Sequence, residues 1–352
     1  MVMTTTHAFC AISSLKAFRH SHSNSPKFSL SSNYWTSLNS HPQFPISNPN
    51  SNFLPPPLSL SSSSMASTVR AISSSASVGT SSSSSVVVGE NDLLIVGPGV
   101  LGRLVAQQWS QDHPGCQIYG KTATTDHHDE LMNIGITPSV KGAMLPCQFP
   151  YVIFCAPPSK SPDYAGDVRE AASSWNGKGS FVFTSSSGLV DCTDNGDCDE
   201  ETPTVPMGKS PRTDVLLKAE NVVLDNGGCI LRLAGLYKAD RGAHTYWLKQ
   251  GKSDLRPDHF VNLIHYEDAA SLAIAILKKN LRARVFLGCD NHPLSRQEIM
   301  DLVIQSGKFS GRFEGFTGAN DSLGKRLNNS KTRAEIGWEP KYPSFAEFLK
   351  VM

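Results

Sequence analysis

Acidic residues are absent from the first 89 positions of this 352-residue chain, and the first carboxylate side chain is that of Glu90. The same segment is rich in Ser, with frequent Pro and Asn. It carries a few scattered cations: Lys16, Arg19, Lys27 and Arg70. Such a composition cannot build a packed core and is typical of an organellar transit segment. We expect residues 1–88 to be a disordered or cleaved transit peptide and linker.

The destination of this segment follows from its balance of Ser over Arg. The segment has no evident basic amphipathic helix, which favours import into the chloroplast stroma. Import into the mitochondrion stays open as the alternative, and so does an ordinary disordered tail.

Long apolar runs are also missing from this segment. None of its runs reaches the roughly 18 residues that a membrane-spanning helix needs, and the short one from Ala8 to Leu15 is interrupted by polar residues. The rest of the chain lacks a basic stripe with interleaved aromatic residues, the usual mark of nucleic-acid binding. We therefore expect neither a membrane nor a nucleic acid as a partner.

Cysteine motifs are lacking as well. The eight cysteines form no CxxC pair and no Cys/His pair at zinc spacing, which is typical of reduced intracellular thiols. Cys192 and Cys198 lie in an acidic loop, where two unbonded surface thiols are expected ahead of a redox pair. The others of interest fall within or beside apolar runs and are expected to be buried: Cys116, Cys155, Cys229 and Cys289.

Metal-binding clusters are not expected either. His127 and His128 stand between Asp126 and Asp129, but adjacent side chains on a helix diverge and no further ligands are visible. We interpret this run as a charged helix start.

The most informative stretch that is present is DLLIVGPGVLGR, residues 92–103. An apolar strand enters a glycine turn and leaves it as a helix, which is the context that a dinucleotide-binding GxGxxG motif requires. Gly97 permits the tight turn, Gly99 lets a diphosphate approach the backbone, and Gly102 lets the helix pack on the strand. The amides of Val100 and Leu101 at the helix start complete the predicted phosphate site.

Strands and helices alternate after this turn. The sequence predicts strands at 116–119, 151–156, 181–183 and 229–233, with helices between them. This βαβ order predicts an α/β fold, a doubly wound parallel (Rossmann) sheet with right-handed crossovers. Ligands of such sheets bind beyond the carboxyl ends of the strands. Ala156 and Pro157, where one strand ends, are therefore candidate cofactor contacts.

The later part of the chain changes character. We expect 90–235 to be the dinucleotide-binding core, and 236–352 to complete that core at about 260–290 and to form a small C-terminal substrate lobe. A short strand at 261–265 precedes an amphipathic helix, and Ser295 is a predicted N-cap with Glu298 as its capping-box partner.

Several segments together resemble the short-chain dehydrogenase/reductase superfamily, in its extended, epimerase/dehydratase-like branch. These segments, in order, are GPGVLG, FVFTSSSG, LRLAGLY, LIHYEDAA, HPLSRQEI and EIGWEPKYPSF. The resemblance covers residues 92–350 and is closest to atypical members that lack the family's catalytic tyrosine. It implies that Ser186 orients a substrate carbonyl or hydroxyl, as a hydroxyl at a strand end can. A serine-rich turn that satisfies its own backbone is the alternative for Ser186.

The family's tyrosine and lysine pair is missing from SPRTDVLLKAEN, residues 210–221. If Lys218 is the lysine, Asp214 stands at the tyrosine position. If Glu220 sets the register, Arg212 and Leu216 occupy the two positions. The general acid is therefore unknown. Tyr237 and His265 are possible substitutes, but we expect Tyr237 to pack beside the cofactor and His265 to fix a loop.

The cofactor preference is predicted from Gly120-Lys121-Thr122, about 20 residues beyond the glycine turn, where NAD-preferring folds carry an acid. Lys121 can neutralise a 2′-phosphate and Thr122 can donate to it, so NADP is preferred over NAD.

Three functions are consistent with these features of the sequence. The first is an NADP(H)-dependent oxidoreductase acting on a small carbonyl, alcohol or sugar-nucleotide-like substrate. The second is a catalytically silent NADP(H)-binding sensor or scaffold, favoured by the missing tyrosine. The third is an NAD-dependent epimerase or dehydratase. A homodimer is a further expectation from the resemblance, although inspection isolates no exposed apolar stripe.

Overall fold

The computed structural model describes residues 88–145 and 147–352, all within the unit Pro56–Met352. The transit segment expected at 1–88 lies outside the described residues except for Val88. Within the described ranges, no helix combines the length and the apolarity needed to cross a membrane.

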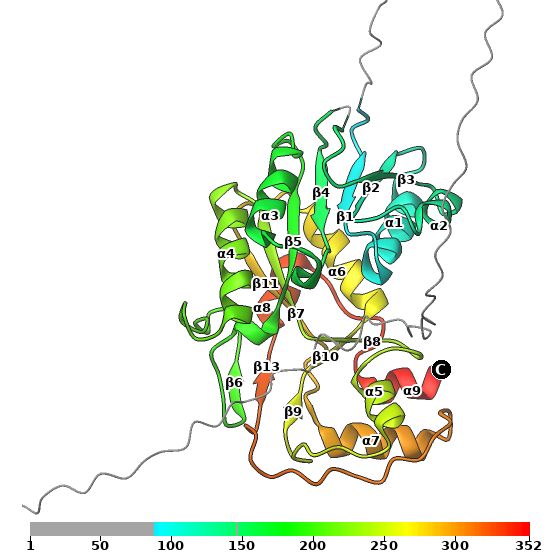
Figure 1. Cartoon of the computed structure of the whole chain (residues 1–352), viewed down its shortest axis with the longest axis vertical. Coiled ribbons are helices and arrows are strands. Elements are labelled where there is room, and N and C mark those ends of the chain that lie inside the picture. Colours follow the sequence, from blue (N-terminus) through cyan, green and yellow to red (C-terminus); the bar gives the residue numbers. More distant parts are fainter. Residues whose placement is uncertain (1–87, 146) are drawn as a thin grey trace, which may run out of the picture. The chain divides into compact units, whose positions relative to one another are not determined.

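A seven-stranded parallel sheet forms the centre of the fold (Figure 1). Its spatial order is β11-β7-β5-β4-β1-β2-β3, so the strand order reverses between β1 and β4. Its strands are β1 (Leu93–Val96), β2 (Ile118–Thr122), β3 (Ile136–Val140), β4 (Tyr151–Phe154), β5 (Phe181–Ser186), β7 (Cys229–Leu233) and β11 (Val285–Gly288). This is the doubly wound Rossmann architecture that the sequence predicts.

Helices cover both faces of this sheet because its strands are apolar on both sides. Leu93 and Ile95 pack with α1 (Val100–Asp112) and α6 (Tyr266–Lys278). Leu94, between them, packs with α3 (Tyr164–Ser173) and α4 (Pro211–Asp225). The remaining pieces near the sheet are α2 (His128–Asn133), the 3-10 turns η2 (Pro158–Lys160) and η3 (Ser187–Leu189), and α8 (Ser330–Ile336).

A smaller lobe follows the last core strands. Its helices α5 (Ala243–Gln250), α7 (Arg296–Ser306) and α9 (Phe345–Val351) share an aromatic-rich core around Tyr237 and Trp247, and Figure 1 shows them gathered together. Short strand pairs connect the lobe to the central sheet: β10 (Leu263–His265) with β8 (Gly235–Tyr237), β12 (Leu294–Ser295) with β9 (Phe260–Val261), and β13 (Lys325–Leu327) with β6 (Gly196–Cys198).

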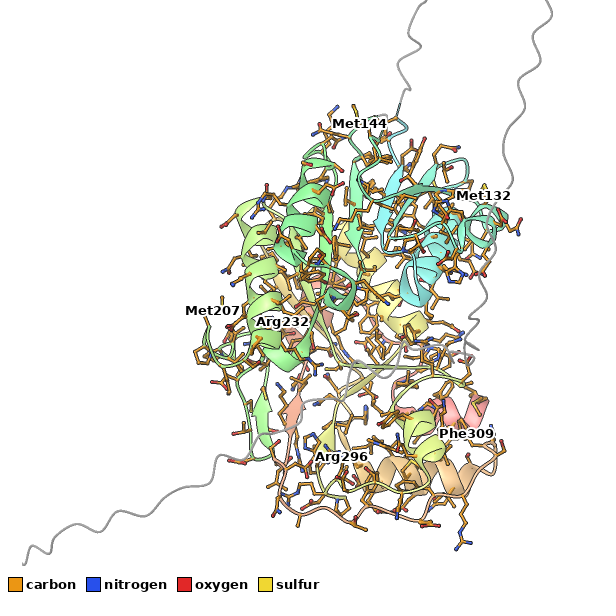
Figure 2. All side chains as sticks on the ribbon, viewed as in Figure 1. Met132, Met144, Met207, Arg232, Arg296 and Phe309 are labelled. Atoms are coloured by element: carbon orange, nitrogen blue, oxygen red, sulfur yellow. The ribbon has the colours of Figure 1, made fainter. Side chains whose placement is uncertain are left out.

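A buried ion pair joins the sheet to α4. Arg232 on β7 donates to Glu220 through Nε at 3.0 Å and through Nη2 at 2.7 Å. Figure 2 shows Arg232 within the body of the fold beside α4, whereas Met144 and Met207 lie at its periphery. The two bonds match the planar guanidinium to both carboxylate oxygens, which satisfies two charges that are out of contact with water.

Candidate nucleotide and substrate site

The glycine turn lies at the carboxyl end of β1, where the strand order reverses. Gly97 has a φ of +79°, and a Cβ there would lie 2.6 Å from the Cα of Ala156. The turn after β1 and the loop after β4 are therefore in direct contact. Only a residue without a side chain fits this position.

Gly102 and Gly99 differ in what surrounds them. A Cβ on Gly102 would lie 2.9 Å from Cγ2 of Ile95, so this glycine lets α1 pack against β1. A Cβ on Gly99 would meet no heavy atom within 4 Å. Gly99 is the N-cap of α1 and provides no side-chain cap. The space beside Gly99, at the start of α1, is therefore open, and the first amides of the helix have no side-chain cap, as a phosphate site at a helix N-terminus requires.

Ala156 and Pro157 follow β4, and Ser186 ends β5. Since β5, β4 and β1 are neighbours in the sheet, all three loops meet at one edge. The structure thus brings together the glycine turn, Ala156, Pro157 and Ser186 as the sequence predicts.

Ser186 is half-buried and caps η3. Its Oγ accepts a hydrogen bond from the amide of Gly188 at 3.1 Å. This is the local turn contact that the alternative interpretation predicts, but the same hydroxyl still carries a proton that it can donate. Its neighbour Thr184 donates to the carbonyl of Phe154 at 3.0 Å, inside the sheet. Ser186 is therefore nearer to the sheet edge and less engaged within the sheet than Thr184.

The Lys121 side chain does not lie where its predicted contact with the 2′-phosphate of NADP requires. Strand β2 begins at Ile118, two residues after the expected start, and ends at Thr122, three residues after the expected end. In this strand the Lys121 side chain points to α3. It is buried, and its Nζ lies 2.6 Å from Oε1 of Glu170 on α3. Both line a cavity of about 410 Å³ beside the loop at 142–148. The ammonium is already neutralised, so Lys121 no longer supports a preference for NADP.

Thr122 is also engaged. Its Oγ1 lies 2.8 Å from Nε2 of His128 and donates to the carbonyl of Ser139 at 3.1 Å. The nearby cation that sequence reasoning missed is Arg103 in the first turn of α1. Its Nη1 pairs with Glu130 of α2 at 2.8 Å and its Nε donates to the carbonyl of Pro98 at 3.3 Å. Its position directly after Gly102 is the signal that identifies it.

The two registers for the missing tyrosine place different residues on α4. In the first, Lys218 is exposed, and Asp214 accepts a hydrogen bond from the amide of Gly208. In the second, Leu216 packs inward, and Arg212, one helical turn before it, is exposed. Both registers therefore stay predictions, and in neither does a tyrosine stand at the start of α4.

Neither substitute acid is placed for proton transfer. Tyr237 is fully buried in the lobe core, and burial raises the pKa of its hydroxyl strongly. It packs edge-on against Phe345 and Phe348. Its expected place beside the cofactor stays a prediction. His265 is the N-cap of α6, and its Nδ1 accepts from the amide of Glu267 at 3.2 Å. Burial lowers the pKa of His265 to about 4, so it is neutral and has the structural role that the sequence favours.

A lysine from the lobe enters the site instead. Lys325 Nζ donates to the carbonyl oxygens of Ser187 at 2.9 Å and Val190 at 2.5 Å. Burial lowers the pKa of its ammonium. Asn262 holds β13 in place through hydrogen bonds to the carbonyl of Lys325 and the amide of Leu327. Lys325 thus ties the lobe to the turn that carries Ser186.

The His127 and Asp126 run behaves as a charged helix start. His127 and Glu130 lie 3.1 Å apart, and Thr124 donates to Asp126. Across the described ranges, no three metal-ligating side chains gather into a potential metal site.

Comparison with known proteins bears on the fold. No family model and no curated protein matches the sequence. Solved structures do match the fold. A functionally unknown conserved protein from Silicibacter pomeroyi is 21% identical with a TM-score of 0.62, covering 74% of this chain and 97% of that one. dTDP-glucose 4,6-dehydratase from Bacillus anthracis, solved with NAD, is 16% identical with a TM-score of 0.61, covering 74% and 94%.

UDP-glucose 4-epimerase from Thermotoga maritima, solved with UDP-glucose, is 16% identical with a TM-score of 0.56, covering 74% of this chain and 96% of that one. The chain has the extended short-chain dehydrogenase/reductase fold.

Proposed function

We propose that this chain binds a nicotinamide dinucleotide at the carboxyl edge of its sheet and acts as an NADP(H)-dependent oxidoreductase on a small carbonyl, alcohol or sugar-nucleotide-like substrate. The observation that carries the proposal is the open space over Gly99, beside uncapped helix amides. The dehydratase and epimerase structures with this fold include NAD complexes.

The residues fit such a cofactor. The amides at 99–102 would hold its diphosphate, and Ala156 and Pro157 would line its path at the switch point. When bound, the nicotinamide supplies a hydride donor or acceptor. Ser186 would donate a hydrogen bond to the substrate oxygen, and Arg212 would attract an anionic group of the substrate, because a guanidinium stays protonated and cannot serve as the acid.

We further propose Arg103 as the partner of the 2′-phosphate of NADP. Its ion pair with Glu130 is partly exposed, with side-chain exposures of 32% and 57%. Exposed pairs of this kind contribute only about 0–1 kcal/mol, so a phosphate can displace Glu130. The bidentate fork of Arg suits phosphate recognition.

The decisive experiment on the cofactor is a substitution of Gly99 by valine. The added side chain would occupy the diphosphate position without a clash inside the protein, so the fold should persist while NADPH and NADH binding, measured by calorimetry, falls at least about ten-fold. Gln107→Val, on the exposed surface of the same helix, is the control. Unchanged binding by Gly99→Val, or no binding of either nucleotide by the wild type at millimolar concentration, would refute the proposal.

A second candidate is a catalytically silent NADP(H)-binding protein, favoured by the burial of both Tyr237 and His265. Carbonyl and alcohol panels with NADPH or NADP separate the two functions. Turnover that is lost in Ser186→Ala supports the enzyme. Tight nucleotide binding with no turnover on any panel favours the silent protein.

We also propose the chloroplast stroma as the location, from the composition of residues 1–88. Residues 1–90 fused to a fluorescent reporter should direct it to plastids. A mitochondrial or diffuse cytosolic signal would contradict this. A homodimer stays a prediction, and on α4 the one large hydrophobic side chain exposed among the described residues is Val215.

A further inference from the structure

Two thiols, those of Cys192 and Cys198, lie close to the same short stretch of backbone at Gly196 and Asp197. Cys198 on β6 is buried in the main core cluster, and the side chain of Cys192 packs against the same cluster. Burial raises the pKa of Cys198 to about 12, and interaction with the Cys192 side chain adds to the effect. Cys198 is thus not the surface thiol that its acidic loop predicts. Its Sγ lies 3.5 Å from the carbonyl oxygen of Gly196, and Cys192 Sγ lies 3.8 Å from the carbonyl oxygen of the next residue, Asp197.

The loop between these cysteines is shaped to bring them together. Asp194 and Asn195 adopt positive φ angles of 52° and 65°, which reverses the chain direction within the loop. Cys192 Sγ then lies over Gly196, where a Cβ would be only 2.8 Å from the sulfur. The amide of Asn195 donates to the carbonyl of Gly324, which fixes the tip of the loop. The approach of the thiols therefore depends on a defined backbone path.

The two thiols differ in access. Cys192 is half-buried, so a small reagent can reach it, whereas Cys198 is only 3% exposed. The Lys325 ammonium lies near both sulfurs and lowers the pKa of Cys198 against the effect of burial. Cationic neighbours favour the thiolate, which is the reactive form of cysteine.

We propose that Cys192 and Cys198 form a reversible dithiol–disulfide site. The Cys192 thiolate attacks a small disulfide, for which oxidised glutathione is the probe, and releases one glutathione thiol. The Cys198 thiolate then attacks Cys192 Sγ, forms the intramolecular S–S bond and releases the second glutathione. Two electrons pass to the glutathione disulfide, and the two protons lost by the protein thiols end on the glutathione thiols.

The loop that carries the two cysteines is linked to the Ser186 turn through Lys325. Strand β6 pairs with β13 in a register that sets Gly196 opposite Lys325. Lys325 in turn holds the carbonyls of Ser187 and Val190. Drawing the two sulfurs together changes the loop that faces this lysine. The proposal concerns the thiols and does not depend on which substrate or cofactor the protein uses.

The sequence offers a clean experiment. Trypsin releases residues 179–209 as one peptide that contains Cys192, Cys198 and no other cysteine. The full chain is equilibrated with glutathione buffers of graded ratio, quenched with acid, alkylated under denaturing conditions and digested. We expect this peptide to lose two hydrogens and resist alkylation, while the peptides of Cys229 and Cys289 in the same sample are alkylated.

Because the intervening loop is short, the same equilibrium is also measured in denaturant. Native proximity should raise the effective concentration of the second thiol by about ten-fold or more over the denatured chain. The Cys192→Ser variant should leave Cys198 unmodified by glutathione, since Cys198 is buried. A peptide that stays a dithiol, a glutathione adduct on Cys192 without the internal bond, or equal constants in the native and denatured states would overturn the proposal.

Discussion

The ammonium of Lys325 lies 2.9 Å from the carbonyl oxygen of Ser187, although the two residues are 138 positions apart in the chain. Lys325 also donates to Val190, and within the described ranges it forms no salt bridge with a carboxylate. A cation held by backbone carbonyls in partial burial restrains the turn that it bonds. This contact gives the lobe direct control over the conformation of the Ser186 turn.

Replacing Lys325 by Met should therefore loosen the turn. Hydrogen bonds to charged groups contribute about 1.5–3 kcal/mol, and we expect a loss of stability in that range. The Val190 amide donates to the Ser187 carbonyl at 3.2 Å, so its hydrogen exchange should accelerate at least about ten-fold. Arg326→Met removes the adjacent, exposed cation and is the control. Unchanged exchange in Lys325→Met would show that the bonds to the turn are dispensable.

The buried pair of Glu220 and Arg232 predicts strong non-additivity. Glu220→Ala leaves a guanidinium uncompensated in the interior and should cost about 3–5 kcal/mol of unfolding free energy. Arg232→Met should cost a similar amount. The double variant Glu220→Met/Arg232→Met removes both charges and should be more stable than either single variant. Denaturant unfolding measures all three, and additive losses would contradict direct pairing.

The sequence predicts strands and helix caps correctly where its apolar periodicity is strong. The strand at Leu93–Val96 was predictable because it is a run of aliphatic residues, and the one at Cys229–Leu233 because Ile230, Leu231 and Leu233 dominate it. The capping box of α7 is present in both halves, with Ser295 Oγ accepting from Glu298 and the Glu298 carboxylate accepting from Ser295. Local chemistry determines such features, so the sequence alone reveals them.

Other elements have no local signal. Strand β3 was not predicted because it lies at the sheet edge, carries Pro138 and is polar at alternate positions. The role assigned to Lys121 depended on where β2 ends, and three further residues of strand turned its side chain toward Glu170. Lys325 lies in a polar stretch whose partners are distant in sequence. Such contacts depend on tertiary packing, which no periodic pattern encodes.

Cofactor preference should follow Arg103 and not Lys121. In Arg103→Gln, the affinity for NADPH should fall about ten-fold or more, a loss of about 1.4 kcal/mol in binding, while that for NADH changes less than about two-fold. Lys121→Met removes a buried charge whose partner Glu170 is 40% exposed, so it should alter stability and leave the NADPH-to-NADH ratio unchanged. Calorimetry with both nucleotides measures the ratio. Loss of preference in Lys121→Met alone would restore the role first predicted for that residue.

Asp290 makes the stability of the lobe dependent on pH. It is 1% exposed, and burial raises the pKa of its carboxyl to about 7. Oδ1 accepts from the amide of His292 at 2.9 Å, whereas Oδ2 and the nearby Tyr237 hydroxyl have no hydrogen-bond partner among the described residues. The folded state therefore favours the protonated acid.

The raised pKa of the Asp290 carboxyl sets the direction in which stability changes with pH. The unfolded carboxyl ionises near pH 4, so between about pH 4 and pH 7 the unfolded state gains stability that the folded state does not, and the protein is destabilised as pH rises. Asp290→Asn stays neutral and can still accept from His292. Its advantage over the wild type in free energy of unfolding, measured by denaturant titration at each pH, should grow from pH 5 to pH 7.5 and then level, reaching on the order of 2–4 kcal/mol.

Asp268→Asn is the comparison variant for Asp290→Asn in this measurement. Burial also raises the pKa of Asp268, to about 6, but its two oxygens accept from the amides of Lys341 and Tyr342 at 2.7 and 3.0 Å. An asparagine there would turn a donor toward one of these amides, so Asp268→Asn should destabilise the protein across the whole range. A pH-independent difference between Asp290→Asn and the wild type would show that Asp290 is ionised in the fold, with a counter-charge or water satisfying Oδ2.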